Sequence, residues 1–296
     1  MKILLIGSTG QIGWELRRSL MPLGTVIAVS QSTQPLQIDL GKPDQIRSIM
    51  AEINPDLVIN AAAYTAVDRA ESEPELARWI NGVAPGILAE EAKRMGAGLI
   101  HYSTDYVFDG RKGSPYGESD LTAPLNVYGK TKLEGEKAIV SVDGNYLILR
   151  TSWVYGNRGK NFLRTVLRLA QEKPELRIVN DQWGAPTWSR TIADCTTFIL
   201  TQSGASLPLF FEKFRGIYHL TASGITNWYE FARSILELAP ETQSYLLQNL
   251  ISIPTTEYPT PAQRPAYSVL DTSLVQKTFG LTLPDWQEAL KLVLTP

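Results

Sequence analysis

The chain has 296 residues and a formal net charge of −2; 44% of its residues are hydrophobic and 20% are charged. This composition is typical of a globular protein with a sizeable core, and it excludes a disordered or collagen-like chain. A charge near zero gives no general attraction to nucleic acid or to an anionic membrane. No apolar stretch reaches the ~18 residues of a membrane span, residues 3–6 are too short for a signal peptide, and Cys195 is the only cysteine, so we expect a cytoplasmic protein without a disulfide.

Apolar runs and helical periodicities alternate along the first half of the chain. The pattern predicts strands at residues 2–6, 26–29, 56–60, 99–103 and 146–150, and helices at residues 14–20, 43–53, 74–95 and 133–140. Strands that alternate with helices are typical of parallel β-α-β units. We therefore expect an α/β fold in which residues 1–152 form a doubly wound parallel sheet, a Rossmann domain.

The second half of the chain has a different composition. Prolines and tryptophans become frequent after residue 152, and helical periodicity remains near residues 161–172 and 227–239. We interpret residues 153–296 as mainly a second, smaller substrate-binding lobe, with parts of 187–215 packing back on the sheet. A crevice between the sheet and this lobe is the expected ligand site.

A glycine-rich turn joins the first predicted strand to the first helix. Gly7, Gly10 and Gly13 have the spacing G-x-x-G-x-x-G. Such glycines make the tight turn, let backbone N–H groups approach a pyrophosphate, and let the helix pack close to the strand, while the helix N-terminus adds a partial positive charge. The position between strand and helix gives this otherwise weak pattern its weight. It predicts dinucleotide binding, with a purely structural turn as the alternative.

The end of the second strand bears on which dinucleotide is bound. A carboxylate there is the usual NAD signature, but this chain has Ser30, with no acid and no Arg or Lys beside it. This indicates use of both NADPH and NADH. Asp39 and Leu40 lie where a loop could contact the adenine, although Asp39 could instead cap a helix. The three alanines at 61–63 allow either close approach to a ligand or tight packing.

A phenol and an ammonium lie four residues apart at Tyr128 and Lys132, which places them one turn apart on one helix face. Ser103 and Thr104 end a preceding strand, so a hydroxyl there and the Tyr–Lys pair would converge on a nicotinamide. Lowering a phenol pKa from about 10 to about 7 takes roughly 4 kcal/mol, which a nearby Lys132 cation helps to supply. The alternative is an exposed Tyr and Lys on a surface helix.

Segments that match one known family occur along nearly the whole chain, at residues 7–16, 60–68, 101–110, 124–136, 150–156, 180–187 and 258–265. In these segments the chain resembles the dTDP-4-dehydrorhamnose reductase family, within the extended short-chain dehydrogenases. The resemblance implies reduction of the C4 ketone of dTDP-4-dehydro-β-L-rhamnose to dTDP-L-rhamnose. The expected partner is therefore a nucleotide-sugar substrate, bound by a monomer or homodimer.

The resemblance also implies roles for individual residues. It assigns Thr104, Tyr128 and Lys132 to catalysis and places Asp105 and Trp153 at the sugar, although Trp153 could equally be a core residue. Arg264 is our candidate for the substrate diphosphate, because a guanidinium suits bidentate phosphate binding; a surface ion pair is the alternative. The predicted cofactor contacts are Gly7, Thr9, Gly10, Gln11, Ile12, Gly13, Ser30, Asp39, Leu40, Ala61, Ala62, Ala63, Tyr64, Thr65, Tyr128 and Lys132.

The chain departs from the family pattern at two places. Ser30 replaces the common ribose-binding acid, which argues against strict use of NADH. Some members have an acidic, Mg²⁺-linked dimer interface; Glu15 is present here, but Arg190 stands where a further acid is expected. The resemblance therefore leaves a bound Mg²⁺ possible, but the positive charge of Arg190 would repel it, and we predict no metal site.

Three other functions remain open. Sugar-nucleotide epimerases and 4,6-dehydratases share the fold and the Tyr–Lys pair, but a dehydratase needs an Asp–Glu pair after the threonine, and here Tyr106 follows Asp105. A regulatory subunit, like that of methionine adenosyltransferase, resembles the family too. The intact Thr104, Tyr128 and Lys132 argue against a purely regulatory role.

Overall fold

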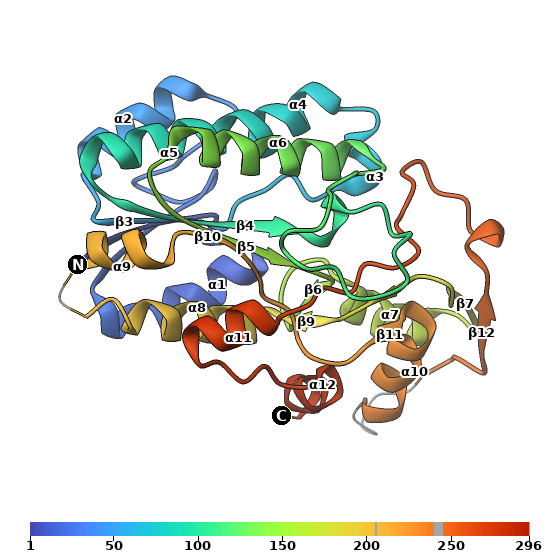
Figure 1. The fold of residues 1–296 in the computed structure, drawn as a ribbon. Helices are drawn as coiled ribbons and strands as arrows, with labels where there is room; N and C mark the ends of the chain where they lie inside the picture. Colours follow the sequence, from blue (N-terminus) through green and yellow to red (C-terminus); the bar gives the residue numbers. More distant parts are fainter. Residues whose placement is uncertain (205, 240–244, 296) are drawn as a thin grey trace.

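The computed structural model describes residues 1–204, 206–239 and 245–295. At its centre lies a six-stranded parallel sheet in the order β10-β5-β4-β3-β1-β2 (Figure 1). Its strands are β1 (Lys2–Ile6), β2 (Thr25–Val29), β3 (Leu57–Asn60), β4 (Gly98–Thr104), β5 (Asn145–Thr151) and β10 (Gly216–His219). The predicted α/β fold with a doubly wound parallel sheet is confirmed.

Helices cover both faces of this sheet (Figure 1). One face carries α2 (Pro43–Ile53), α5 (Ala84–Met95) and α6 (Val127–Val142), and the other carries α1 (Gln11–Ser19), α8 (Ser189–Thr201), α9 (Leu207–Phe214) and α11 (Ser273–Phe279). Because side chains alternate along a strand, Leu4 and Ile6 of β1 pack on the first group and Ile3 and Leu5 on the second. Burial on both faces explains why β1 is an unbroken apolar run.

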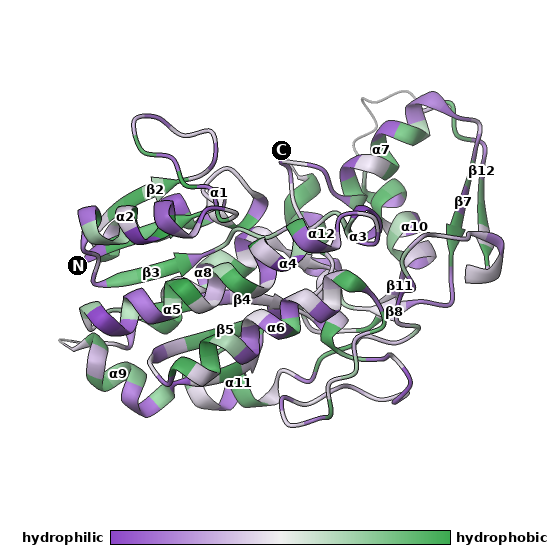
Figure 2. Cartoon of the chain, turned by 90° about the horizontal axis from the view of Figure 1, so that it is seen from above, coloured by the Kyte–Doolittle hydropathy of each residue, from purple (hydrophilic) through white to green (hydrophobic). Residues whose placement is uncertain are grey.

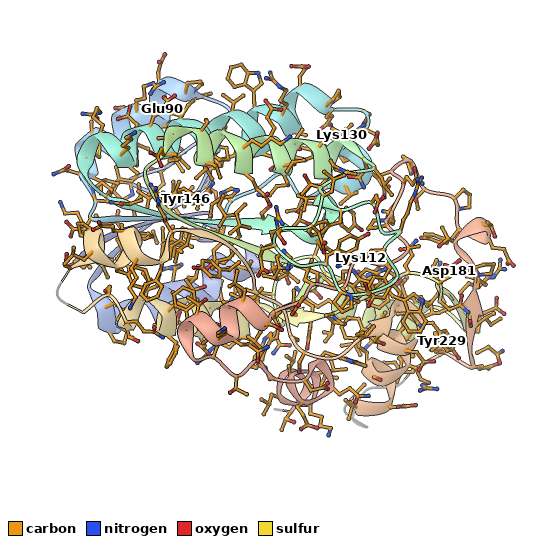
Figure 3. The ribbon with its side chains drawn as sticks, viewed as in Figure 1. Glu90, Lys112, Lys130, Tyr146, Asp181 and Tyr229 are labelled. Carbon is orange, nitrogen blue, oxygen red and sulfur yellow. The ribbon has the colours of Figure 1, made fainter. Side chains whose placement is uncertain are left out.

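The outer surfaces of these layers are polar. Glu90 on α5 and Lys130 on α6 project away from the sheet (Figure 3), whereas the central strand β3 is coloured as hydrophobic (Figure 2). Cys195 on α8 is a free cysteine buried in the core. Within the described part of the chain, no helix has the length and apolarity needed to cross a membrane.

A second lobe is built from later segments. It contains α7 (Phe162–Glu172), α10 (Trp228–Leu238) and α12 (Trp286–Leu294), and three strand pairs: β6 (Val154–Tyr155) with β9 (Thr187–Trp188), β8 (Trp183–Gly184) with β11 (Thr226–Asn227), and β7 (Glu175–Val179) with β12 (Asn249–Ile253). Its core packs Tyr155, Phe231 and Trp286 together.

The two lobes exchange elements along the sequence. Four elements that follow residue 152 nevertheless belong to the first lobe. Strand β10 is an edge strand of the sheet, and helices α8, α9 and α11 pack on it. The division into residues 1–152 and 153–296 stays a prediction, and positions 205, 240–244 and 296 lie outside the described residues.

Three predicted helices differ from the observed ones. The helix expected at 14–20 begins at Gln11, directly after the glycine turn, and ends at Ser19. The helix expected at 133–140 begins at Val127, so it includes both Tyr128 and Lys132. The single helix expected at 74–95 is divided into α4 (Pro74–Arg78), a π-helical turn at Trp79–Val83, and α5. In this turn the Asn81 side chain accepts from Tyr64 N (2.8 Å) and donates to Tyr64 O (3.0 Å). This contact reaches outside the helix, so helical periodicity could not predict it.

Short helices complete the chain. They are α3 (Val67–Ala70) and the 3-10 turns Met21–Leu23, Asp105–Val107 and Thr255–Glu257.

Candidate active site

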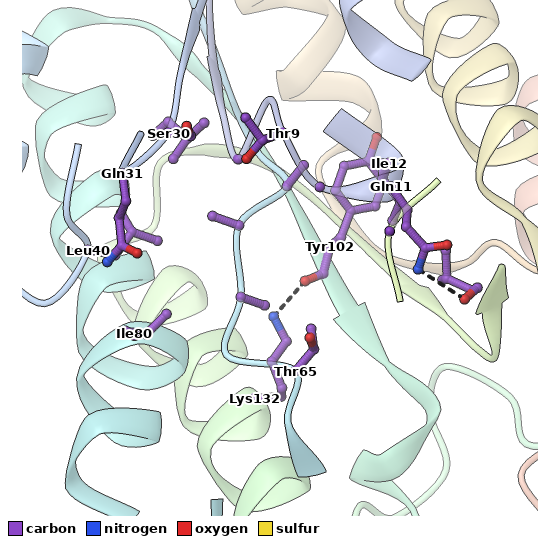
Figure 4. A pocket seen from close by; sticks show the side chains of 18 of the residues that line it. Thr9, Gln11, Ile12, Ser30, Gln31, Leu40, Thr65, Ile80, Tyr102 and Lys132 are labelled. Carbon is purple, nitrogen blue, oxygen red and sulfur yellow. Dashed lines mark hydrogen bonds between the residues drawn. The ribbon is translucent and has the colours of Figure 1, made fainter. Parts of the chain in front are cut away.

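A cavity of about 610 Å³ opens at the carboxyl ends of the sheet strands (Figure 4). Gly7 follows β1, Ser30 follows β2, Ala61 follows β3, and Ser103 and Thr151 belong to the ends of β4 and β5; all of them line the cavity. The chain passes from β1 to β2 on one side and to β3 on the other, so this is the switch point at which open α/β sheets bind ligands.

The cavity brings together most of the residues predicted to bind a cofactor. Its lining includes Gly7, Thr9, Gly10, Gln11, Ile12, Ser30, Leu40, Ala61, Ala62, Ala63, Thr65, Tyr128 and Lys132. Gly13, Asp39 and Tyr64 do not line it. The sequence analysis missed several lining residues, among them Gln31, Thr151 and Lys160.

The glycine turn fits the pyrophosphate of a dinucleotide. Gly7 has φ +84°, and a Cβ there would lie 2.6 Å from Ala62 N, so a side chain would close the approach to the strand ends. Gly10 precedes α1, and in the described chain no side chain caps this helix N-terminus. The N–H groups of its first turn therefore remain available to an anion. Gly13 has a packing role, because a Cβ there would collide with the Gly7 carbonyl.

The loop after β2 is held by its own polar side chains. Ser30 Oγ lies 3.3 Å from Ser32 Oγ, and Gln31 Nε2 donates to Asp39 Oδ1 over 3.1 Å. Asp39 Oδ1 also accepts from Gly41 N at 2.9 Å, whereas the residue preceding α2 is Lys42. Asp39 therefore closes a turn in its own loop, and the alternative that it caps the following helix is wrong.

Helix α6 carries the two catalytic candidates on one face. Asn126 begins the helix by accepting from Gly129 N at 2.8 Å. Burial raises the pKa of Tyr128 to about 12, although the Thr104 hydroxyl opposes this, so the lowered phenol pKa expected from the sequence is not found in the cofactor-free protein. Lys132 Nζ donates to Tyr102 O over 2.7 Å (Figure 4) and lies 3.0 Å from His101 Nε2. Burial lowers the pKa of Lys132 to about 8.

Two polar residues at the end of β4 are bound to each other. Thr104 Oγ1 donates to Asp105 Oδ1 at 2.9 Å and accepts from Tyr106 N at 3.2 Å. Asp105 is 2% exposed, and its Oδ2 has no hydrogen-bond partner among the described residues. Burial raises the pKa of Asp105 to about 6. Ser103 Oγ and Thr151 Oγ1 are likewise buried and unpartnered in the described chain, and both residues line the cavity.

Apart from Tyr128, the predicted substrate residues lie outside the cavity lining: Thr104 and Asp105 directly follow the lining residue Ser103, and Trp153 and Arg264 belong to other segments. Trp153 adopts φ +45° and stacks on Trp228, with ring centroids 3.5 Å apart and planes 7° apart. Arg264 binds Asp68 through two hydrogen bonds (3.0 and 2.8 Å) and also donates to Thr260 Oγ1 at 2.6 Å. In this state Arg264 is in an ion pair, as the alternative interpretation expected, and 20% of its side chain is exposed.

Glu15 and Arg190, the two residues considered for an Mg²⁺ site, take part in ion pairs. Arg190 lies 4.0 Å from Glu15 and binds Asp194 at 2.9 Å. Within the described ranges, no group of three or more His, Cys, Asp or Glu side chains is arranged to hold a metal ion.

Comparison with known proteins gives consistent matches over the whole chain. The family model described as RmlD substrate binding domain matches residues 1–296. The dTDP-4-dehydrorhamnose reductase of Escherichia coli K12 is 48% identical, covering 99% of this chain and 97% of the relative.

Two crystal structures are similar as well. A dTDP-4-dehydrorhamnose reductase from Clostridium acetobutylicum has a TM-score of 0.88 at 37% identity, covering 99% of this chain and 98% of that chain. The Bacillus anthracis enzyme, in complex with NADP, has a TM-score of 0.86 at 31% identity and the same coverage. The resemblance seen in the sequence is confirmed: this chain belongs to the dTDP-4-dehydrorhamnose reductase family.

Proposed function

We propose that this protein reduces the C4 ketone of dTDP-4-dehydro-β-L-rhamnose to dTDP-L-rhamnose with NADPH or NADH. The observation that carries the proposal is that Tyr128 and Lys132 line the same cavity as the glycine turn, next to the end of β4. The name of the E. coli relative supports the substrate, and the NADP complex of the B. anthracis relative supports the cofactor. The monomeric or homodimeric state and the cytoplasmic location stay predictions.

The residues around the cavity suit a dinucleotide. Gly7, Gly10 and Gln11 would hold the pyrophosphate, while Ser30 and Leu40 would contact the adenosine end. Ser30 and Gln31 offer no charge to attract or repel a 2′-phosphate, so use of both NADPH and NADH is expected. The reduced nicotinamide supplies the hydride when it is bound.

Tyr128 is the proton donor in this proposal. Its raised pKa means that the phenol keeps its proton at neutral pH, which is the state needed to protonate the oxygen at C4 during reduction. Donation of this proton leaves a phenolate at Tyr128. Lys132, one helical turn away, would stabilise that phenolate when the lysine itself is protonated. The Thr104 hydroxyl, which donates to Asp105 in the free protein, would turn to donate to the substrate carbonyl oxygen. Asp105 and Trp153 are proposed sugar contacts, and Arg264 a diphosphate contact once it releases Asp68.

The test is a coupled assay that follows the absorbance of the reduced nicotinamide. The ketone is supplied by a 3,5-epimerase acting on dTDP-4-dehydro-6-deoxy-D-glucose. We expect epimerase-dependent oxidation of NADPH and NADH, and a loss of about 10²–10⁴-fold in kcat for Tyr128→Phe. Tyr146→Phe is the matched control, because Tyr146 lies near the start of β5, at the end of the strand away from the cavity (Figure 3). Absence of turnover from protein that binds NADPH would contradict the assigned substrate.

A further inference from the structure

Three buried polar side chains form a continuous chain beneath the cavity. Asn60 ends β3, His101 lies on β4 and Lys132 on α6, and their exposed fractions are 0%, 1% and 1%. Asn60 Nδ2 lies 3.1 Å from His101 Nδ1, and Lys132 Nζ lies 3.0 Å from His101 Nε2. Each contact needs one donor and one acceptor, so the positions of the hydrogens are constrained.

The backbone sets the direction of this chain at Asn60. Ala62 N donates to Asn60 Oδ1 over 3.1 Å, and a backbone N–H can only donate. The other end of the amide, its NH₂ group, therefore faces His101 and donates to Nδ1. A neutral imidazole that accepts at Nδ1 carries its hydrogen on Nε2. His101 is neutral, because burial holds its pKa well below the usual value.

The hydrogen on His101 Nε2 points at Lys132 Nζ. A neutral amine accepts this hydrogen with its lone pair and donates its own N–H to Tyr102 O at 2.7 Å, which satisfies every group in the chain. An ammonium at Lys132 would point an N–H at the Nε2–H of His101, so that two donors face each other. If His101 instead carried its hydrogen on Nδ1, that N–H would face the NH₂ group of Asn60. A buried donor without an acceptor is costly, so the arrangement favours the uncharged amine.

We propose that His101 is a positioning residue whose Nε2–H donates to Lys132 Nζ and, by favouring the uncharged amine, lowers the proton affinity of Lys132 in the cofactor-free protein. This inference rests on the proposed role of Lys132 in the reductase site. Once Tyr128 has given its proton to the C4 oxygen, the phenolate would raise the proton affinity of Lys132, which would then hold a proton taken up from solvent. The pKa of Lys132, lowered by burial, agrees with the low proton affinity in the cofactor-free protein.

Other titratable groups near Lys132 do not account for a neutral amine. Glu136 raises the lysine pKa, and it is itself bound by Arg150 at 2.9 and 2.7 Å. Among the other titratable residues, Tyr128 and Glu134 lie on α6, Tyr102 on β4 and Asp105 after β4, and Glu134 is paired with Arg78. Asp68 on α3 is paired with Arg264.

The experiment titrates Lys132 directly in the cofactor-free protein. Lysine side chains labelled with ¹³C at Cε are followed by NMR as the pH rises, and Lys132→Met identifies the signal. We expect wild-type Lys132 to titrate well below an ordinary lysine. In His101→Gln, an amide oxygen can accept from an ammonium, so the lysine pKa should rise by at least one unit, a tenfold change in proton affinity. His219→Gln is the matched control, since His219 is the other buried histidine of the sheet.

A second variant reverses the direction of these hydrogen bonds and keeps the imidazole ring of His101. In Asn60→Asp, a carboxylate still accepts from Ala62 N and now also accepts from His101 Nδ1–H, so Nε2 becomes an acceptor for an ammonium. The lysine pKa should rise here too, and the pH profile of kcat/KM should shift in the same direction. An unchanged Lys132 titration in both folded variants would overturn the proposal. This readout needs no turnover, so it remains decisive even if the proposed substrate is wrong.

Discussion

Asp105 is a buried carboxyl that the folded protein prefers to keep protonated. Its folded pKa of about 6 lies above the value near 3.9 of an unfolded chain, because burial disfavours the anion. The folded state therefore binds more protons between pH 4 and 6, and its stability falls as the pH rises through that window. At pH 7 the cost is on the order of 3 kcal/mol. We expect Asp105→Asn to be more stable than wild type at pH 7 and to lose this advantage near pH 4.

Urea unfolding at pH 4, 5, 6 and 7 measures this difference. Asp109→Asn is a control of opposite sign, since Arg111 N and the Tyr116 hydroxyl donate to Asp109 and lower its pKa. That variant should lose stability relative to wild type as the pH rises. A stability difference for Asp105→Asn that does not change with pH would show that the carboxyl ionises freely in the fold.

A buried ion pair joins α6 to β5. Arg150 and Glu136 form two hydrogen bonds, and their side chains are 3% and 2% exposed. Removing one charge leaves the other buried and unpaired, so Arg150→Met or Glu136→Leu alone should cost about 3–5 kcal/mol in the free energy of unfolding. The double variant should cost much less than the sum. A double-mutant cycle from urea unfolding checks this, and additive losses would contradict the expected coupling.

At the scale of elements, the positions of strands and helices followed from the sequence, but several contacts did not. The apolar runs predicted β1 at its observed bounds, because burial on both faces needs only local composition. His101 is buried in the core and hydrogen-bonded to Asn60. Its contact with Lys132 was not predicted, since the partners are 31 residues apart and no spacing rule links them. The ion pair of Arg264 with Asp68, 196 residues apart, was open for the same reason.

The N-terminus of α6 sets the position of Tyr128. Asn126 accepts from Gly129 N at 2.8 Å and donates to Gln263 O at 2.7 Å, so it both caps the helix and fixes the loop that follows β12. We expect Asn126→Ala to lower the free energy of unfolding by about 1–2 kcal/mol and also to lower kcat/KM. Asp285→Ala removes a cap from α12, whose Asp285 Oδ1 accepts from Gln287 N at 2.8 Å. This control should lose similar stability with unchanged kcat/KM, and equal kinetic effects in both variants would contradict a specific role of Asn126.

At the scale of the whole molecule, the cavity is shared between the lobes. The sequence predicted a crevice between them, and the glycine turn supplies one wall of the observed cavity. An adjoining part of the lining comes from the segment before α7, which is bound to the glycine turn: Gln11 donates to Val154 O at 3.3 Å, and Asn161 donates to Gln11 Oε1 at 2.8 Å. Gly159 and Lys160 of this segment line the cavity. Sequence reasoning missed Lys160 because a single exposed lysine in a loop carries no pattern.

Lys160 brings a positive charge from the second lobe to the cavity, close to the N-terminus of α1. Among the described residues it has no ion-pair or hydrogen-bond partner, and besides Lys132 it is the one cation in the cavity lining. A charge near the glycine turn would act on the pyrophosphate, which NADPH and NADH share. We expect Lys160→Gln to weaken the binding of both by about fivefold, or ~1 kcal/mol, and to reduce the salt dependence of binding. Fluorescence titration measures both Kd values, with Lys277→Gln on α11 as the control at an exposed lysine away from the cavity. A loss confined to NADPH would instead place Lys160 at the 2′-phosphate, and no loss would mean that the segment before α7 shapes the cavity without contributing its charge.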